Sequence, residues 1–244
     1  MKAITPKYLI LLAILTGFIS LIKPNYLFIL MLFPIIPKIK FISHKKKYVY
    51  LAILLFVAIF FRIFWNSIIP NVPETRIANL DPIKQASFVL LDPIGFIKIF
   101  TNTIIHGPIP ITQMIIGVFG WLYYRLPDYI YIIFYIIFIP VSLFDITIDN
   151  TLFIRDRILS SMIFMIFIIT LYIFFFITWN PVGAQLIDGV QGRYMLPILG
   201  VFSLSFTNLK FLSKPIISKT LVLSFVLISL SSSIMLLLNK FYHL

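Results

Sequence analysis

Long runs of apolar residues, separated by shorter polar stretches, dominate the chain. Several runs approach the roughly 20 residues that are needed to cross a bilayer core about 30 Å thick. Six of them are predicted transmembrane helices: Tyr8–Ile22, Tyr48–Trp65, Tyr129–Phe144, Leu159–Trp179, Met195–Phe206 and Leu221–Leu238. The pattern predicts an all-α membrane protein, a bundle of about six or seven transmembrane helices that forms a single membrane domain over residues 1–244.

One further apolar run, Tyr26–Ile36, is short and is interrupted by Pro34, with Pro37 directly after it. A segment of this length forms either a thin span that its flanking residues extend, or a hairpin that enters the membrane and returns. The sequence leaves both alternatives open.

The stretch Asn66–Asp128 is polar enough to form a long loop outside the membrane. Asp81 and Asp92 each precede a proline, a pair that is typical of a helix N-cap followed by the first helical residue. Pro93–Ile105 is apolar on nearly every face, so we expect a helix that lies in the membrane interface. Gln113–Arg125, which is rich in glycine and aromatic residues, is predicted to be a short re-entrant or interfacial element.

Composition supports the membrane assignment, because 61% of the 244 residues are hydrophobic and only 11% are charged. The formal net charge of +12 also suits a nucleic-acid-binding protein. However, five lysines fall between Lys38 and Lys47, in one connector between apolar runs, and cytoplasmic loops of membrane proteins retain such residues. We therefore expect no nucleic-acid partner. The chain has no cysteine, which excludes disulfides and thiolate metal sites.

With the Lys38–Lys47 connector in the cytoplasm, the other connectors alternate between the two sides of the membrane. The N-terminus and the basic residues Arg155, Arg157 and Lys210–Lys219 then lie inside, whereas Asn66–Asp128 and Asn180–Tyr194 lie outside. This topology predicts a multi-pass protein of the plasma membrane. Its two outer loops are expected to meet as one polar surface around Arg193.

The second outer loop contains the densest cluster of chemically informative residues, Gly189-Val190-Gln191-Gly192-Arg193-Tyr194. The glycines allow a tight turn or a close approach to a ligand, and Arg193 offers a planar fork of donors that suits phosphate or carboxylate. Gln191 and Tyr194 supply neutral hydrogen bonds. The alternative is structural: Arg193 pairs with Asp188 or caps the membrane interface.

This motif, continued by Met195-Leu196-Pro197, resembles the hallmark of the bacterial membrane proteins of the domain-of-unknown-function (DUF) 2142 family. Upstream residues agree in order and spacing with that family's long outer loop: Asn79 to Gln85, Asp92-Pro93, Gln113, Gly120-Trp121 and Leu126-Pro127. The similarity extends from about Leu51 to Leu238. It adds Gln85 and Gln113 to Arg193, Gln191, Tyr194 and Asp188 as candidate substrate-binding residues.

The resembled family is similar in turn to glycosyltransferases of the GT-C fold class, which use sugars linked to lipid phosphates. This similarity implies a role in assembling cell-envelope glycans, with a polyprenyl-phosphate-linked sugar as substrate and no cofactor. Members usually carry an acidic, histidine-bearing outer loop after the first span, whereas here Lys23-Pro24-Asn25 follows it. The chain therefore resembles the C-terminal half of a longer protein, or a reduced member of the family.

The missing loop leaves the catalytic residues unknown, because removing a proton from an acceptor hydroxyl requires a positioned base. Asp81 and Asp92 have an alternative role as helix caps, whereas Glu74 and Asp188 are freer. His106 is a further candidate base or phosphate contact. The three histidines are scattered along the chain and predict no metal site.

Three functions remain open at this point. The chain is a GT-C-like enzyme, or it is a non-catalytic membrane subunit or fragment that packs against another polytopic protein. A transporter is disfavoured, because the ionisable residues lie mostly in loops and coupled transport places polar groups near the membrane midplane.

Overall fold

The computed structural model describes residues 6–22, 24–36, 40–41, 43–69, 79–107, 111–119, 124–144, 153–205 and 215–242. The predicted features Glu74, Trp121, Lys210 and His243 lie outside these residues. The elements follow one another in this order: α1 (Pro6–Ile22), η1 (Pro24–Ile35), α2 (His44–Ile68), α3 (Pro82–Leu91), α4 (Pro93–His106), α5 (Ile111–Ile116), β1 (Val118–Phe119), β2 (Tyr124–Arg125), α6 (Asp128–Phe144), α7 (Ile154–Trp179), η3 (Gly192–Tyr194), α8 (Leu196–Leu204) and α9 (Pro215–Tyr242).

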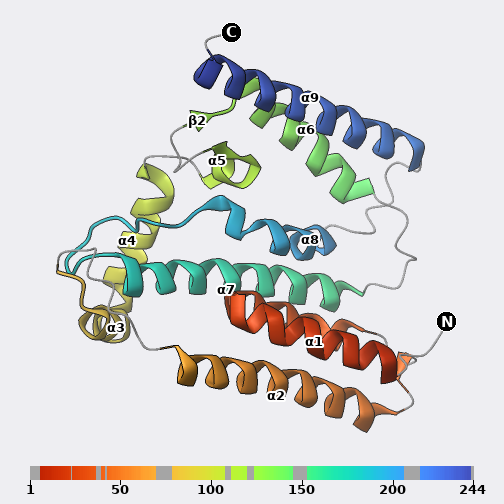
Figure 1. The fold of residues 1–244 in the computed structure, drawn as a ribbon, viewed down its shortest axis with the longest axis vertical. Helices are drawn as coiled ribbons and strands as arrows, with labels where there is room; N and C mark the ends of the chain where they lie inside the picture. Colours follow the sequence, from red (N-terminus) through yellow and green to blue (C-terminus); the bar gives the residue numbers. More distant parts are fainter. Residues whose placement is uncertain are drawn as a thin grey trace.

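The predicted all-α membrane protein is confirmed. Three helices among the described residues are long and apolar enough to cross a membrane, at Lys45–Ile68, Ile154–Trp179 and Leu223–Lys240. Shorter apolar helices form Pro6–Ile22, Asn25–Ile35 and Asp128–Phe138. The chain packs these helices side by side, as Figure 1 shows.

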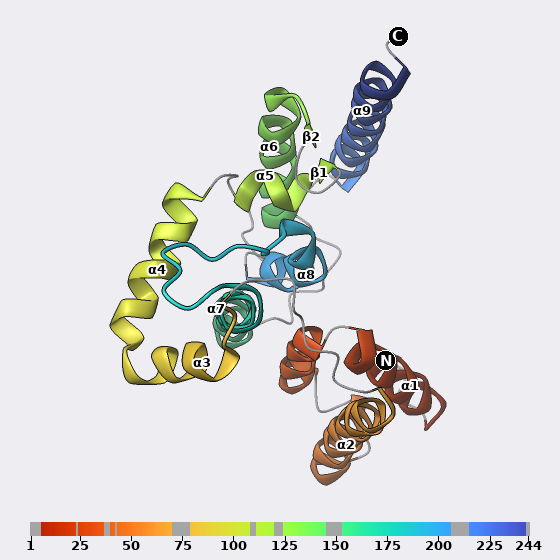
Figure 2. The same cartoon turned by 60° about the vertical axis from the view of Figure 1, so that its left-hand side comes forward.

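Helix α7 is the centre of the packing. It contacts α8, η1 and α3, and it lies between α1, η1 and α2 on one side and α6 with α9 on the other (Figure 2). Its buried residues include Ile163, Phe167, Leu171 and Phe176, which recur at intervals of three to five residues and so form one stripe along the helix. Phe96 of α4 and Ile187 of the loop after α7 are among the other residues that pack into this core.

Segment η1 is one continuous 3-10 helix of 12 residues, so the hairpin alternative for this region does not apply. At about 2.0 Å per residue, the helix spans about 24 Å, slightly less than a bilayer core. The buried Lys47 of α2 donates from Nζ to the carbonyls of Pro34, at 2.8 Å, and Ile36, which fixes the end of η1 beside the basic connector.

The two predicted helix starts in the long loop are also confirmed. Asp81 accepts a hydrogen bond from the backbone N–H of Lys84 at 3.0 Å, and Asp92 accepts one from that of Gly95 at 2.8 Å. Helices α3 and α4 meet at a bend of 106°. Within Gln113–Arg125, predicted to be a re-entrant or interfacial element, the described residues form most of the short helix α5 and the antiparallel pair β1–β2, and the position of this region relative to the membrane stays a prediction.

The arrangement places the basic connector and the loops that are predicted to lie outside at opposite ends of the bundle. Figure 1 shows α3, α4 and the loop after α7 at one end, and the starts of α2, α7 and α9 at the other. The predicted topology can be tested directly by labelling introduced cysteines. The chain has no native cysteine, so labelling at other positions gives no background.

We expect Gln185→Cys, in an exposed position of the loop after α7, to react with a membrane-impermeant maleimide in cells with a sealed plasma membrane. Lys46→Cys, also exposed but in the basic end of α2, should react only after the membrane is permeabilised. Gel-shift labelling measures both. Labelling of Lys46→Cys alone in sealed cells would show that the predicted orientation is inverted.

Candidate functional site

The site is built on the C-terminal end of α7, where helix carbonyls have no partner within the helix. Gln85 of α3 is only 1% exposed, and its Nε2 lies within hydrogen-bond distance of three carbonyls at or just beyond this helix end, those of Phe176, Asn180 and Pro181, at 3.4, 3.2 and 2.9 Å. Its amide nitrogen is thus engaged with the protein. Gln85 therefore helps to hold α3 against the end of α7, and its contact with substrate stays a prediction.

Asn180 closes the loop that follows α7. Its Oδ1 accepts from the backbone N–H of Asp188 at 2.8 Å, and its Nδ2 donates to the carbonyls of Phe175 and Asp188 at 2.9 and 3.2 Å. The side chain is fully buried. Sequence reasoning missed this residue because its partners lie several residues away and no local pattern marks them.

The two loops that are predicted to lie on the same side of the membrane contact each other. Thr103 of α4 accepts a hydrogen bond from the backbone N–H of Ile187 at 2.9 Å, and Asn102 donates to the carbonyl of Gln185 at 3.2 Å. The backbone N–H of Val182 donates to the carbonyl of Asn79 at 3.1 Å. Helices α3 and α4 therefore hold the loop of residues 180–188 along its length.

Gly189 turns the chain into the motif with a φ of +87°. A Cβ at this position would overlap the Trp179 ring, so both the backbone conformation and the space require glycine. Gly183 has nearly the same φ, +86°, but a Cβ there would meet nothing within 4 Å. The two glycines are thus a matched pair that differ in their surroundings.

Gly192 brings the motif into direct contact with α5. A Cβ at this position would overlap the backbone of Met114 and Ile115, so η3 and α5 touch main chain to main chain. Gln191 precedes Gly192, and Gln113 precedes Met114. Each of these glutamines has a buried Oε1 without a hydrogen-bond partner. The structure therefore brings these two predicted site residues into the same region and leaves both acceptors unused.

Arg193 and Asp188 are both exposed. The ion pairs recorded for the described residues are Lys84–Asp81 and Arg155–Asp156, so the alternative in which Arg193 pairs with Asp188 is not observed. The guanidinium of Arg193 instead lies over the Tyr194 ring, with Cζ 5.8 Å from its centroid. Tyr194 in turn stacks on Phe175 of α7, with centroids 5.5 Å apart and planes inclined by 10°.

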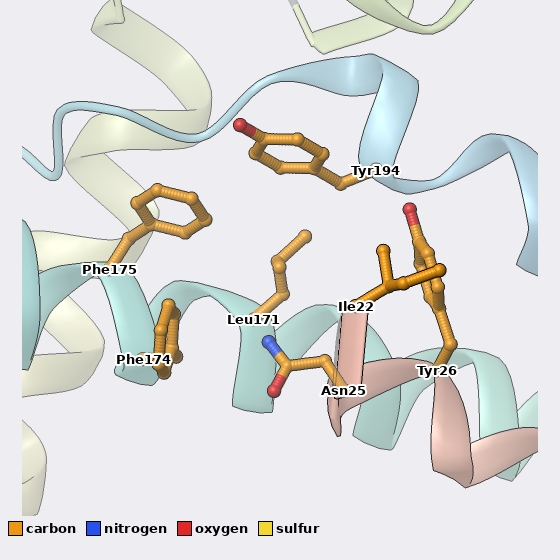
Figure 3. A pocket seen from close by; sticks show the side chains of 7 residues that line it. All are labelled: Ile22, Asn25, Tyr26, Leu171, Phe174, Phe175 and Tyr194. Atoms are coloured by element: carbon orange, nitrogen blue, oxygen red, sulfur yellow. The ribbon is translucent and has the colours of Figure 1, made fainter. Parts of the chain in front are cut away.

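Beside this stacked pair lies a pocket of about 210 Å³. Figure 3 shows its seven lining side chains, which come from α1, η1, α7 and η3: Ile22, Asn25, Tyr26, Leu171, Phe174, Phe175 and Tyr194. Tyr194 thus belongs both to the motif and to the pocket wall. No local pattern in the sequence marks this pocket, because the N-terminal residues that line it are far from the motif along the chain.

The acidic residues near the site serve mainly as caps. The hydrogen bond from the Lys84 backbone N–H lowers the pKa of Asp81, so its charged, capping form is the stable one. That contribution is complete above the ordinary carboxyl pKa and is lost as the pH falls through the lowered value. His106 is exposed at the end of α4. No cluster of metal-ligating side chains occurs among the described residues.

The helical bundle and the glycine-rich motif at one of its ends define a polytopic membrane protein. A family model described as a predicted membrane protein, DUF2142, matches residues 1–202, and the chain belongs to that family. The match begins at residue 1 and ends within α8, whereas the sequence resemblance placed it at about Leu51 to Leu238. No curated protein and no solved structure matches the chain.

The paired glycines at 183 and 189 give the first test of the site. We expect Gly189→Ala to lower the free energy of unfolding by about 1–3 kcal/mol more than Gly183→Ala, because both strain the backbone and only the first collides with Trp179. Thermal unfolding in detergent, followed by tryptophan fluorescence, measures the difference. Equal effects would contradict the packing of Trp179 on Gly189.

Gly192 allows a second comparison, with Gly200 in α8 as control. Gly192→Ala should sharply reduce the yield of monodisperse protein after detergent extraction, since no flexible side chain can move to accommodate the new methyl group. Gly200→Ala meets nothing within 4 Å and should stabilise its helix by about 0.5–1 kcal/mol. Normal yield and melting temperature for Gly192→Ala would rule out the contact with α5.

Proposed function

We propose that the chain binds a lipid-phosphate-linked sugar at the outer end of the bundle, as a GT-C-like glycosyltransferase or its substrate-holding part. Its role would be in cell-envelope glycan assembly at the plasma membrane, with the N-terminus in the cytoplasm. One observation carries the proposal: Arg193 is an exposed cation, outside the ion pairs recorded for the described residues, beside an aromatic pocket.

The chemistry of this arrangement favours an anionic amphiphile. A guanidinium binds phosphate oxygens through two parallel hydrogen bonds, and an arginine at the end of a membrane bundle is costly to leave without a partner. Gln191 and Gln113 lie next to the contact between η3 and α5, and each has a buried Oε1 that no protein donor meets. In this proposal they support the site from within the protein. Asp188 lies on the same loop, and its carboxylate is the candidate among the described residues for interaction with the acceptor.

A second candidate function is that of a non-catalytic membrane subunit that packs against another polytopic protein. The use of Asp81 and Asp92 as helix caps favours it, because these acids are then not free to act as a base. A transfer assay with a polyprenyl-phosphate-linked sugar separates the two functions. Turnover by this chain alone supports the enzyme, whereas binding without turnover supports the subunit.

The binding proposal has its own test. We expect Arg193→Ala to weaken binding of a polyprenyl-phosphate-linked sugar in lipid nanodiscs by about 10- to 100-fold, because a charge-assisted hydrogen bond is lost. Lys98→Ala removes a cation from an exposed position on α4 and serves as the control for net charge. Arg193→Lys should give an intermediate affinity, since lysine keeps the charge but not the planar fork.

Affinity is measured by displacement of a fluorescent ligand, after size-exclusion chromatography shows that each variant is folded. Unchanged binding by Arg193→Ala, or an equal loss in Lys98→Ala, would overturn the assignment of Arg193.

A further inference from the structure

The pocket beside Tyr194 has the chemistry of a hydrocarbon site. Four of its seven lining side chains are aromatic, Tyr26, Phe174, Phe175 and Tyr194, and Asn25 is the one amide. Figure 3 shows Phe174 and Phe175 on one side, Tyr26 on the other and Tyr194 above them. A pocket with this lining is suited to an apolar group and offers few polar partners for a sugar.

The position of the pocket matches the depth of a lipid chain just below its headgroup. Phe174 and Phe175 precede the end of α7 at Trp179 by five and four residues, which is about 6–8 Å along the helix axis. The pocket extends deeper along α7 to Leu171, eight residues before that end, and Ile22 at the end of α1 with Asn25 and Tyr26 of η1 form its other wall. Ile22 is 74% exposed and Phe174 47%, which leaves the rim open toward the surrounding lipid.

The shape of the walls favours a flat group over a saturated chain. Tyr194 and Phe175 are nearly parallel, and Tyr26 is likewise stacked on Phe167, with planes inclined by 15°. The ring faces that such pairs leave uncovered are flat, and a planar, branched alkene unit packs against them more closely than a chain of tetrahedral methylenes does. The volume of about 210 Å³ is below the 300–1,000 Å³ typical of pockets that enclose a whole small molecule. The pocket therefore accommodates a segment of a chain.

We propose that this pocket binds the first isoprene units of a polyprenyl chain, directly after the phosphate. The inference rests on the proposed function, in which Arg193 binds that phosphate, and it adds how the carrier lipid is recognised. The link between the two subsites is Tyr194, whose ring lies under the Arg193 guanidinium and forms a wall of the pocket. A headgroup on Arg193 thus has the pocket next to it.

The test uses farnesyl phosphate that carries a photoreactive diazirine in its first isoprene unit, with the full chain in nanodiscs. Mass spectrometry identifies the labelled peptides. We expect labels on the segments that contain Tyr26, Phe174 and Tyr194. Unlabelled farnesyl phosphate should compete at least about tenfold better than dodecyl phosphate, which has the same headgroup and a saturated chain of similar length.

Two substitutions in α1 distinguish binding in the pocket from binding elsewhere on the lipid-facing surface. Ile22→Trp places a large ring at the rim of the pocket, and because the residue is exposed, the substitution does not overpack the core. It should reduce pocket labelling about tenfold. Leu15→Trp makes a comparable change two turns earlier, at a residue that is 48% exposed and does not line the pocket, and labelling should stay unchanged.

The outcomes distinguish this inference from the proposed function. Labelling that depends on Arg193 but falls outside the pocket, or that Ile22→Trp does not reduce, would overturn the chain site and leave the phosphate site standing. Pocket labelling that Arg193→Ala leaves unchanged would overturn the phosphate site and support the pocket as a chain site. Equal competition by dodecyl phosphate would overturn the choice of an isoprenoid.

Discussion

The end of the bundle that carries the motif depends on two buried amides at the C-terminal end of α7. Polar backbone groups near a helix end are costly to leave unpaired in a membrane protein with little water nearby. Gln85 donates to the carbonyls of Phe176 and Pro181, and Asn180 donates to that of Phe175, so the two amides join the last turn of α7 to the loop that follows it. Because both side chains are buried, their amides act as fixed joints between α7, α3 and the loop that carries the motif.

Once α3 is fixed on α7, the positions of the later elements follow. Asp92 ends α3 and caps α4, so the 106° bend directs α4 along the loop of residues 180–188. Thr103 and Asn102 then hold that loop by its backbone. The result is that the loop leading to Arg193 is held by hydrogen bonds to α4 and to Asn180, whereas the Arg193 side chain itself is exposed.

Patterns among neighbouring residues predicted many of the helices. Contacts between residues that are far apart in the sequence could not be predicted. Asp81 and Asp92 were identified as helix caps because the acceptor and the following proline are adjacent in the chain. Gln85 was expected to contact substrate, but its partners are 91 to 96 residues away, and nothing near it in the sequence indicates them. The same holds for the pocket, where Tyr26 meets Tyr194 only through the fold. The long apolar helices, by contrast, could be predicted from the length of the apolar runs alone, and the sidedness that the basic connectors indicate stays a prediction.

The contact of Gly192 with α5 has a consequence for which changes the chain tolerates. Interfaces made of side chains can repack when a residue changes, whereas this one is made of two backbones and has no adaptable part. Inserting one residue into α5 would turn everything after it by about 100° around the helix axis. Gln113 and Gly192 could not then both keep their places. Length variation is therefore excluded from α5 and from the segment Gly189–Met195, even though both lie among loops, where insertions are ordinarily accepted.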